Sequence, residues 1–194
     1  MTDAHDHDDH DHDHEHHHVL SYPDAVAQYR EDKDDFFRNA PNSPIPAAER
    51  EAFSGLPYYP IDESMSFDDL ELAPYAGDEP VRFQMPTSDG RLRPAERAGV
   101  FTFPVGGEDR TLTAYIFEGD DTSNVFVPFV DTTSGTETYG AGRYLDVARE
   151  EDGTYSLDFN LAYHPSCVYD EKYSCPLTPA ENRLPVPIRA GERL

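Results

Sequence analysis

A chain of 194 residues with 37% hydrophobic content has the length of one compact domain. Its 39 Asp and Glu residues outnumber 15 Lys and Arg residues, which gives a formal net charge of -24 at neutral pH. Because phosphate backbones and anionic lipids are bound through Lys and Arg, this balance argues against partners such as nucleic acids and membrane surfaces.

The chain opens with a low-complexity stretch, residues 1–18, in which histidines are interleaved with Asp and Glu. It has no apolar run to bury, so we expect a disordered tail. Imidazole is the commonest ligand for transition metals, and carboxylates add further ligands. We therefore predict a tail that captures divalent metal ions, Zn²⁺ or Ni²⁺, although an expression tag is the alternative. Its predicted ligands are His5, His7, His10, His12, His14, His16, His17 and His18.

Residues 19–60 form a predicted helical and proline-rich segment that packs on the body. Ser21 offers an N-cap, Pro23 suits the first helical turn, and the following apolar side chains fall near one stripe. These signals predict a helix over Tyr22–Arg38. A second, short helix is expected over Pro46–Phe53, ended by Gly55.

Residues 61–194 form a predicted β domain, since from Val81 onward the apolar pattern has period two. Short strands separated by turn signals favour a mostly β fold, an antiparallel barrel or sandwich, with one or two N-terminal helices. Pro128 marks an edge strand or a bulge, because proline cannot donate to a ladder. The expected strands are Val81–Met85, Gly99–Val105, Thr111–Glu118, Asn124–Val130, Arg143–Arg149, Tyr155–Tyr163 and one near Pro185–Ala190.

The hairpin over residues 143–163 has a predictable register. A three-residue loop with a left-handed Gly153 pairs Leu145 with Phe159 and buries no carboxylate. A two-residue turn would instead put Asp146 on the apolar face, so we predict the three-residue loop. Its register brings four polar side chains together on the opposite face: Tyr144, Asp146, Asp158 and Asn160.

A second group that could carry chemistry is His164, Cys167 and Cys175. As a zinc site it would need a fourth ligand, and its cysteine spacing is not that of a standard knuckle. A loop disulfide, or a Cys167 nucleophile with His164 as base, is also open. We favour a pair of buried structural cysteines.

The glycine-rich passage 132–143 offers backbone donors and the Arg143 guanidinium, to which a small anion could bind. It lacks the ending of a phosphate-binding loop. A flexible connection between strands is the more ordinary interpretation.

Residues 131–192 contain six short motifs: Gly140–Asp146, Leu157–Tyr163, Pro165–Cys167, Cys175–Leu177, Glu181–Leu184 and Ala190–Glu192. In these motifs the chain resembles the family catalogued as domain of unknown function 1684. The resemblance also extends to the predicted first helix and the turn at Thr87–Gly90, but not to the tail. It implies a bacterial or archaeal protein of about this size and brings no established activity.

Together these features predict a binding protein in a salt-rich cytoplasm. At molar salt the Debye length falls to about 3 Å, which screens the self-repulsion of an acidic chain. The sequence shows no secretory signal and no apolar run of 18 residues. The predicted partner is a small ligand or a protein at a site near the 143–163 hairpin. The site residues are Arg143, Tyr144, Asp158, Asn160, Tyr163 and Asn182.

Two other functions remain open at this stage. One is a metal- or cysteine-dependent enzyme of the hydrolase type, which would use His164, Cys167 and Cys175. The other is a structural or assembly module in which aromatic surface pairs subunits. We expect binding rather than catalysis, because no orienting third group can be identified for a nucleophile.

Overall fold

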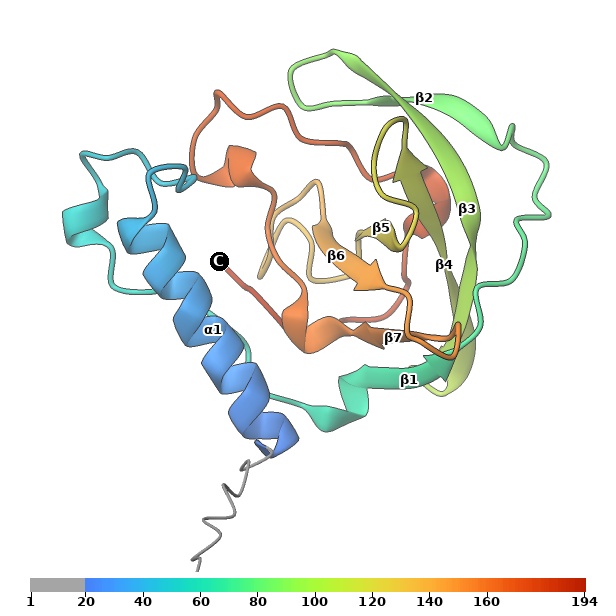
Figure 1. Cartoon of the computed structure of the whole chain (residues 1–194), viewed down its shortest axis with the longest axis horizontal. Helices are drawn as coiled ribbons and strands as arrows, with labels where there is room; N and C mark the ends of the chain where they lie inside the picture. The colour runs from blue at the N-terminus through green and yellow to red at the C-terminus, as the bar shows by residue number, and fades with distance from the viewer. Residues whose placement is uncertain (1–19) are drawn as a thin grey trace, which may run out of the picture.

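The computed structural model describes residues 20–194, which form one α-helix, seven strands and short 3₁₀ turns (Figure 1). The predicted mostly antiparallel β fold with an N-terminal helix is confirmed. In this part of the chain no helix is long and apolar enough to cross a membrane. The α-helix and strands are α1 (Tyr22–Asn39), β1 (Ser66–Leu70), β2 (Arg82–Pro86), β3 (Leu92–Val105), β4 (Glu108–Phe117), β5 (Asn124–Phe129), β6 (Arg143–Ala148) and β7 (Tyr155–Asp158). The 3₁₀ turns are η1 (Arg50–Ala52), η2 (Glu63–Met65), η3 (Phe159–Leu161), η4 (Ser166–Val168) and η5 (Ala180–Asn182).

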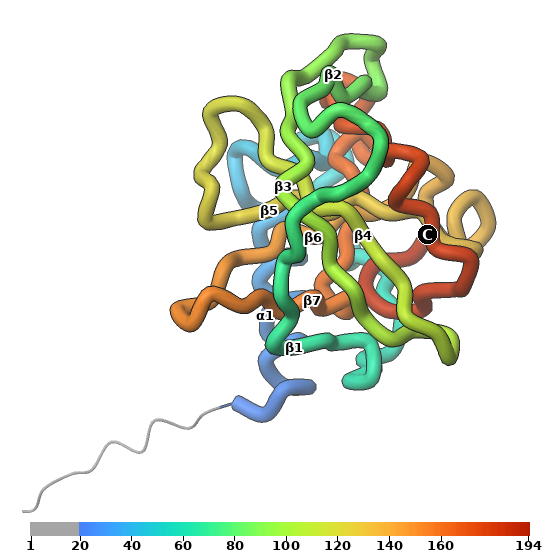
Figure 2. The backbone as a smooth tube through the Cα atoms, turned by 90° about the vertical axis from the view of Figure 1, so that its right-hand side faces the viewer, coloured from blue at the N-terminus to red at the C-terminus, as the bar shows by residue number. Residues whose placement is uncertain are grey.

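The strands form a five-stranded sheet in the order β2-β3-β4-β5-β6 and a two-stranded sheet of β1 and β7. Every neighbouring pair is antiparallel. Two isolated bridges connect the small sheet with the large one. Ala73, just after β1, pairs with Val100 of β3, and Arg149, just after β6, pairs with Tyr155 of β7. The result is a partly closed barrel, with β2 at one end of the body and β1 and β7 at the other (Figure 2).

The main core lies inside this barrel. Alternate side chains of β3 to β7 point inward, as the period-two pattern requires. Phe101, Leu112 and Leu157 are fully buried there. The predicted inward pair of the hairpin, Leu145 and Phe159, belongs to the same core cluster.

The hairpin turn has the predicted geometry. Gly153 is left-handed with φ of 93° and Arg149 faces Tyr155. The Glu150 amide donates to the Thr154 carbonyl, which closes the three-residue loop 151–153. Beyond this base, however, β7 pairs with β1 and not with β6. The predicted strand Tyr155–Tyr163 is therefore wrong after Asp158, where the chain turns into η3.

Two further expectations about strands are wrong. Residues 185–190, expected to be a strand, have no regular structure, and β1 was not expected. Of the two alternatives for Pro128, an edge strand or a bulge, the edge strand is wrong, because β5 lies between β4 and β6. The Asn182 side chain makes the hydrogen bonds that a proline at this position cannot make, as described below.

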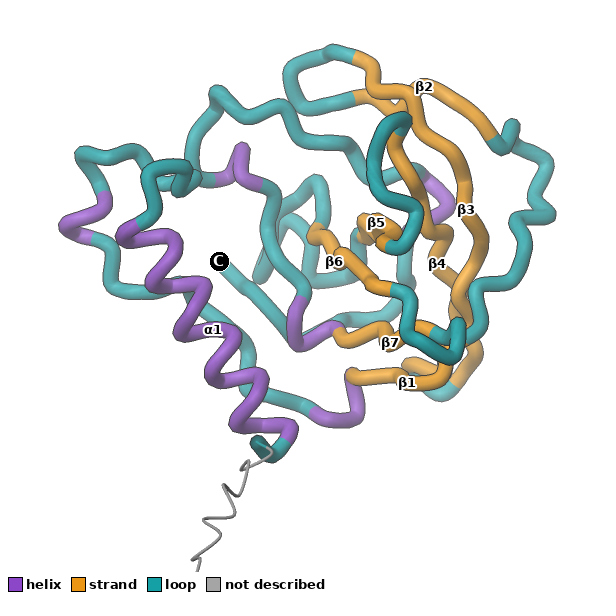
Figure 3. The backbone as a smooth tube through the Cα atoms, in the orientation of Figure 1, coloured by secondary structure: helices purple, strands orange, loops and turns teal. Residues whose placement is uncertain are grey.

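Helix α1 matches its prediction to within one residue. The Ser21 hydroxyl accepts from the amide of Asp24, and Val26 and Phe37 are buried. The second expected helix is reduced to the 3₁₀ turn η1, and loops fill most of the space between α1 and the strands (Figure 3). Phe37 packs there in a satellite cluster with Ile45 and Leu56.

Candidate functional site

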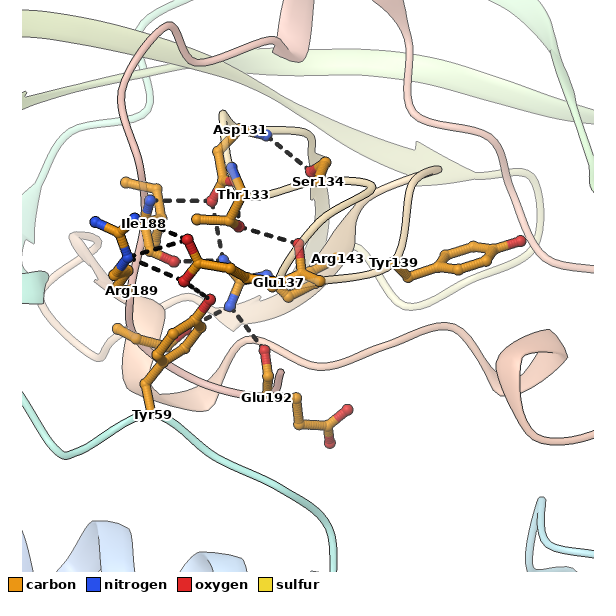
Figure 4. Close-up of polar contacts among 12 residues, drawn as sticks. Tyr59, Asp131, Thr133, Ser134, Glu137, Tyr139, Arg143, Ile188, Arg189 and Glu192 are labelled. Atoms are coloured by element: carbon orange, nitrogen blue, oxygen red, sulfur yellow. Dashed lines mark hydrogen bonds and ion pairs between the residues drawn. The ribbon is translucent and has the colours of Figure 1, made fainter. Parts of the chain in front are cut away.

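The six predicted site residues do not form one site, and four of them make contacts that hold the fold together. Arg143 begins β6 and is 1% exposed. Its guanidinium donates to the Asp131 carboxylate at 2.9 Å and to the Ile188 carbonyl at 2.6 Å. It also donates to the carbonyls of Ala190 and Glu192 (Figure 4). The Arg143 guanidinium is thus occupied by the C-terminal segment, and the hypothesis that it binds an anion is wrong.

Asn182 completes the β4–β5 ladder. The pairing of Tyr115 with Phe126 sets a register in which Thr113 would lie opposite Pro128, which has no amide hydrogen. The Asn182 side chain fills this gap: it accepts from the Thr113 amide at 2.8 Å and donates to the Thr113 carbonyl at 2.8 Å. It donates to the Pro128 carbonyl as well, at 2.7 Å. All its polar atoms are used inside the protein.

Asn160 fastens the N-terminal part of the chain to the barrel. Its side chain accepts from the Asp62 amide and donates to the Asp62 carbonyl and the Tyr22 hydroxyl, at 2.8–2.9 Å. Asp158 caps η3 by accepting from the Asn160 amide, and it also accepts from the Tyr22 hydroxyl at 2.9 Å. The predicted grouping of Tyr144 with Asp158 and Asn160 is therefore wrong, because the chain turns at η3 and β7 pairs with β1.

Tyr144 and Tyr163, the remaining two, lie on the outer face of the large sheet. They face each other across an isolated bridge, with ring centroids 5.7 Å apart and planes at 90°. Phe126 packs on Tyr144 at 4.7 Å, and Phe117 packs on Phe126 at 5.3 Å. We call these four side chains the outer aromatic row: Phe117, Phe126, Tyr144 and Tyr163.

Asp146 also lies on this outer face, two residues after Tyr144 on β6. Its carboxylate accepts from the Tyr163 hydroxyl at 2.6 Å, and its side chain is exposed. Burial, reinforced by the Asp146 charge, raises the pKa of Tyr163, so this phenol stays protonated and keeps donating. The Tyr144 hydroxyl donates to the Pro176 carbonyl, which holds the loop after η4 against the sheet.

Two adjacent hollows open on either side of the Tyr163–Asp146 pair. One has a volume of about 250 Å³ and contains the whole outer aromatic row; the other has about 300 Å³ and lies against α1. Both are lined by Asp146, Tyr163 and Ser166, and together we call them the outer groove. A larger hollow of about 590 Å³ lies over β2, β3 and β4 and shares Phe117 and Asp120 with the groove.

Cations cap both ends of the aromatic row. Arg93 lies 3.7 Å from the centroid of the Phe117 ring, and Lys33 lies 4.6 Å from that of Tyr163. Each is held in an ion pair: Arg93 with Asp120 at 3.0 Å, and Lys33 with the buried Glu192 at 2.6 Å. The sequence analysis did not identify Asp120 and Glu192 as site residues. A charged residue among the apolar positions of α1, Lys33, was the sequence signal that a buried acidic partner is needed there.

His164 is buried beside this groove and is not available as a metal ligand. Its Nε2 accepts from the Tyr139 amide at 3.2 Å, and its Nδ1 lies 3.6 Å from Glu192. Burial, together with the nearby charges of Arg143 and Lys33, lowers the pKa of His164 to about 4. The imidazole is therefore neutral at physiological pH.

Cys167 and Cys175 are free thiols. The Cys167 amide donates to the Cys175 sulfur at 3.3 Å, and burial raises the pKa of Cys175 to about 11. Within residues 20–194 no three His, Cys, Asp or Glu side chains are arranged to hold a metal ion. The described residues therefore give no support to the zinc hypothesis for His164, Cys167 and Cys175. Cys175 packs as a buried side chain. The eight predicted tail ligands lie outside the described residues.

The chain is similar to a protein whose solution NMR structure is known, the uncharacterized protein from gene locus rrnAC0354 of Haloarcula marismortui. The two are 35% identical, with a TM-score of 0.65, over 88% of this chain and 93% of that one. Among curated proteins, none matches. The family model described as "Protein of unknown function (DUF1684)" matches residues 51–193, which is most of the chain. The protein therefore belongs to the DUF1684 family.

Proposed function

We propose that this protein binds a small molecule in the outer groove. Ligand pockets usually combine apolar and aromatic walls with a few convergent polar groups. The outer groove has this composition: four aromatic rings form its walls, and Asp146 and Ser166 supply polar atoms. The observation that carries the proposal is the pair of hollows meeting at Tyr163 and Asp146.

The contrast with the internal polar residues supports this proposal. Arg143, Asn160 and Asn182 are at most 1% exposed and direct their polar atoms to protein partners. Asp146 is exposed and, within residues 20–194, receives a side-chain hydrogen bond only from Tyr163. Its second oxygen remains available to a ligand.

A fragment screen by NMR tests the proposal. The full chain, labelled at its aromatic rings, would be titrated with mixtures of small charged and neutral fragments. We expect at least one fragment to shift the Tyr144 and Tyr163 signals, and Tyr163→Ala to weaken its binding at least tenfold by removing a wall. Leu92→Ala is the matched control, because Leu92 is exposed and outside the groove. Binding that shifts only signals elsewhere would refute the proposal.

We further propose that residues 1–18 capture divalent transition metal ions, Zn²⁺ or Ni²⁺. The supporting observation is the density of histidines interleaved with carboxylates. In the full chain, replacing the eight tail histidines by Gln should abolish tight Zn²⁺ and Ni²⁺ binding measured by calorimetry. His164→Gln, the matched control, should leave the stoichiometry unchanged. Retention of a tight equivalent after the tail replacement would contradict the proposal.

We infer a salt-rich cytoplasm as the working environment, on the strength of the net charge of -24. Raising KCl from about 0.1 M to about 1 M shortens the Debye length from about 10 Å to about 3 Å. The midpoint of urea unfolding should therefore rise with KCl across this range. A midpoint that falls or stays constant would contradict the inference.

A further inference from the structure

We propose that the ligand of the outer groove is a small organic cation, an alkylammonium compound with a compact apolar body. This inference rests on the proposed function and adds the chemical class of the ligand. The binding position is the hollow of about 250 Å³ that contains the outer aromatic row.

The walls of this hollow suit a cation. Aromatic faces carry a negative quadrupole, and several rings set at large angles can surround an ammonium group. Tyr144 and Tyr163 meet at 90°, and Phe126 meets Tyr144 at 70°. The three rings pack edge to face on one another, so a cation would bind against the ring surfaces that line the hollow and not between the rings.

The charges in the hollow favour a cation over an anion. Its ionised side chains are Arg93, Asp120 and Asp146. Arg93 and Asp120 neutralise each other, with both carboxylate oxygens within 3.2 Å of the guanidinium. In the described part of the chain Asp146 is in no ion pair, so the hollow has an excess of one negative charge.

Nearby charges do not reverse this balance. Lys33, on the α1 side of Tyr163, is only 14% exposed at its side chain and pairs with Glu192 at 2.6 Å. Asp121 lines an adjoining hollow with Asp146 and adds negative charge.

The size of the hollow limits the ligand. Pockets for drug-sized ligands have volumes of about 300–1,000 Å³. At about 250 Å³ the hollow is slightly smaller, which suits an alkylammonium headgroup with a short chain. The continuation past Asp146 toward α1 would allow a longer substituent to extend along the groove.

The test compares probes of matched shape and different charge in the full chain, at one fixed KCl concentration. The probes are choline, its uncharged carbon isostere dimethylbutanol, and the anion pivalate. Binding is followed by the ring signals of the outer aromatic row. We expect choline to bind at least about tenfold more tightly than dimethylbutanol, since cation–π contacts together with the attraction of the Asp146 carboxylate contribute about that much. Pivalate should not bind.

Asp146→Asn removes the charge and keeps an oxygen that can accept from the Tyr163 hydroxyl. It should weaken choline binding about tenfold and leave dimethylbutanol binding unchanged within about twofold. Asp68→Asn is the matched control, because Asp68 is an exposed carboxylate of β1 outside the groove. It makes the same change in net charge and should alter neither affinity.

The outcomes separate this inference from the proposed function. If dimethylbutanol or pivalate shifts the ring signals as strongly as choline, the groove binds ligands but the cationic class is wrong. If Asp146→Asn and Asp68→Asn weaken choline binding equally, the effect is long-range and the assignment to Asp146 is wrong. If neither the probes nor the fragments shift these signals, both proposals fall.

Discussion

Asn182 occupies the place in the β4–β5 ladder that Pro128 leaves without a donor. Its amide accepts from one strand and donates to carbonyls of both, at 2.7–2.8 Å. A proline can therefore lie in an interior strand of this sheet, although proline is ordinarily confined to edges and bulges. The following residues are joined to the same strand, since Leu184 donates to the Val130 carbonyl at 2.8 Å.

Asn182→Ala should lower the free energy of unfolding by about 3–5 kcal/mol. The substitution leaves the Thr113 amide and two carbonyls buried without partners, and each such group costs about 1–3 kcal/mol. Urea unfolding followed by circular dichroism measures the loss. Asn39→Ala is the control, because Asn39 is exposed and bonds only to Asp35. A loss below about 1 kcal/mol for Asn182→Ala would show that the amide is replaceable, by water for example.

Arg143→Met should destabilise the protein by about 3–5 kcal/mol, because it leaves the buried Asp131 carboxylate without its charge partner. The double variant Arg143→Met with Asp131→Asn should be more stable than the single variant, since no buried charge remains. Urea unfolding of the two single variants and the double variant gives the coupling between the side chains. Simple additivity would mean that the two side chains stabilise the fold independently.

The stability of the protein should fall on mild acidification because of His164. Its pKa is lowered from 6.5 to about 4 in the folded state, so unfolding takes up a proton between these values. The contribution is fully present above pH 6.5 and is lost as the pH falls toward 4. A shift of this size corresponds to about 3 kcal/mol.

His164→Gln isolates this titration, because the carboxylates titrate in both proteins. The difference in unfolding free energy between the wild type and this variant should shrink by up to about 3 kcal/mol between pH 7 and pH 4. Urea unfolding at several pH values measures it. A difference that does not change with pH would mean that folding does not lower the pKa of His164.

Cys175 should react slowly with alkylating reagents. Its pKa of about 11 leaves about one thiolate in a thousand at pH 8, against roughly a quarter for an ordinary thiol. In Cys167→Ser, where Cys175 is the remaining cysteine, iodoacetamide should react at least about 100-fold more slowly than with a free cysteine. Mass spectrometry follows the reaction, and urea should restore the ordinary rate. A native rate equal to that in urea would contradict the buried position.

Features with a local cause could be predicted closely. Ser21 and Pro23 determine where α1 begins, because capping involves neighbours in the chain. Gly153 determines the base of the hairpin, because a left-handed residue completes a three-residue loop. From that register we could predict that the side chains of Leu145 and Phe159 point into the core, where both are found.

The site residues were predicted less well. Tyr144 and Tyr163 do line the outer groove, but Asn160 and Asn182 proved to be internal. An alternating strand pattern cannot show which strand a segment pairs with, and β7 already pairs with β1 before Asp158 caps η3. Nor can it show which amides lack partners, since that depends on strands far apart in the sequence.

Composition and short-range pattern alone established an acidic, mostly antiparallel chain behind one capped helix, because charge, capping and turn geometry depend on residues close in sequence. Only the tertiary structure brought Lys33 to Glu192 and Asn182 to Pro128. Such contacts arise where the barrel closes on itself, and their partners are chosen by the packing of the core. The outer groove depends on the same closure, since its walls come from β4, β5, β6 and the segment after η3.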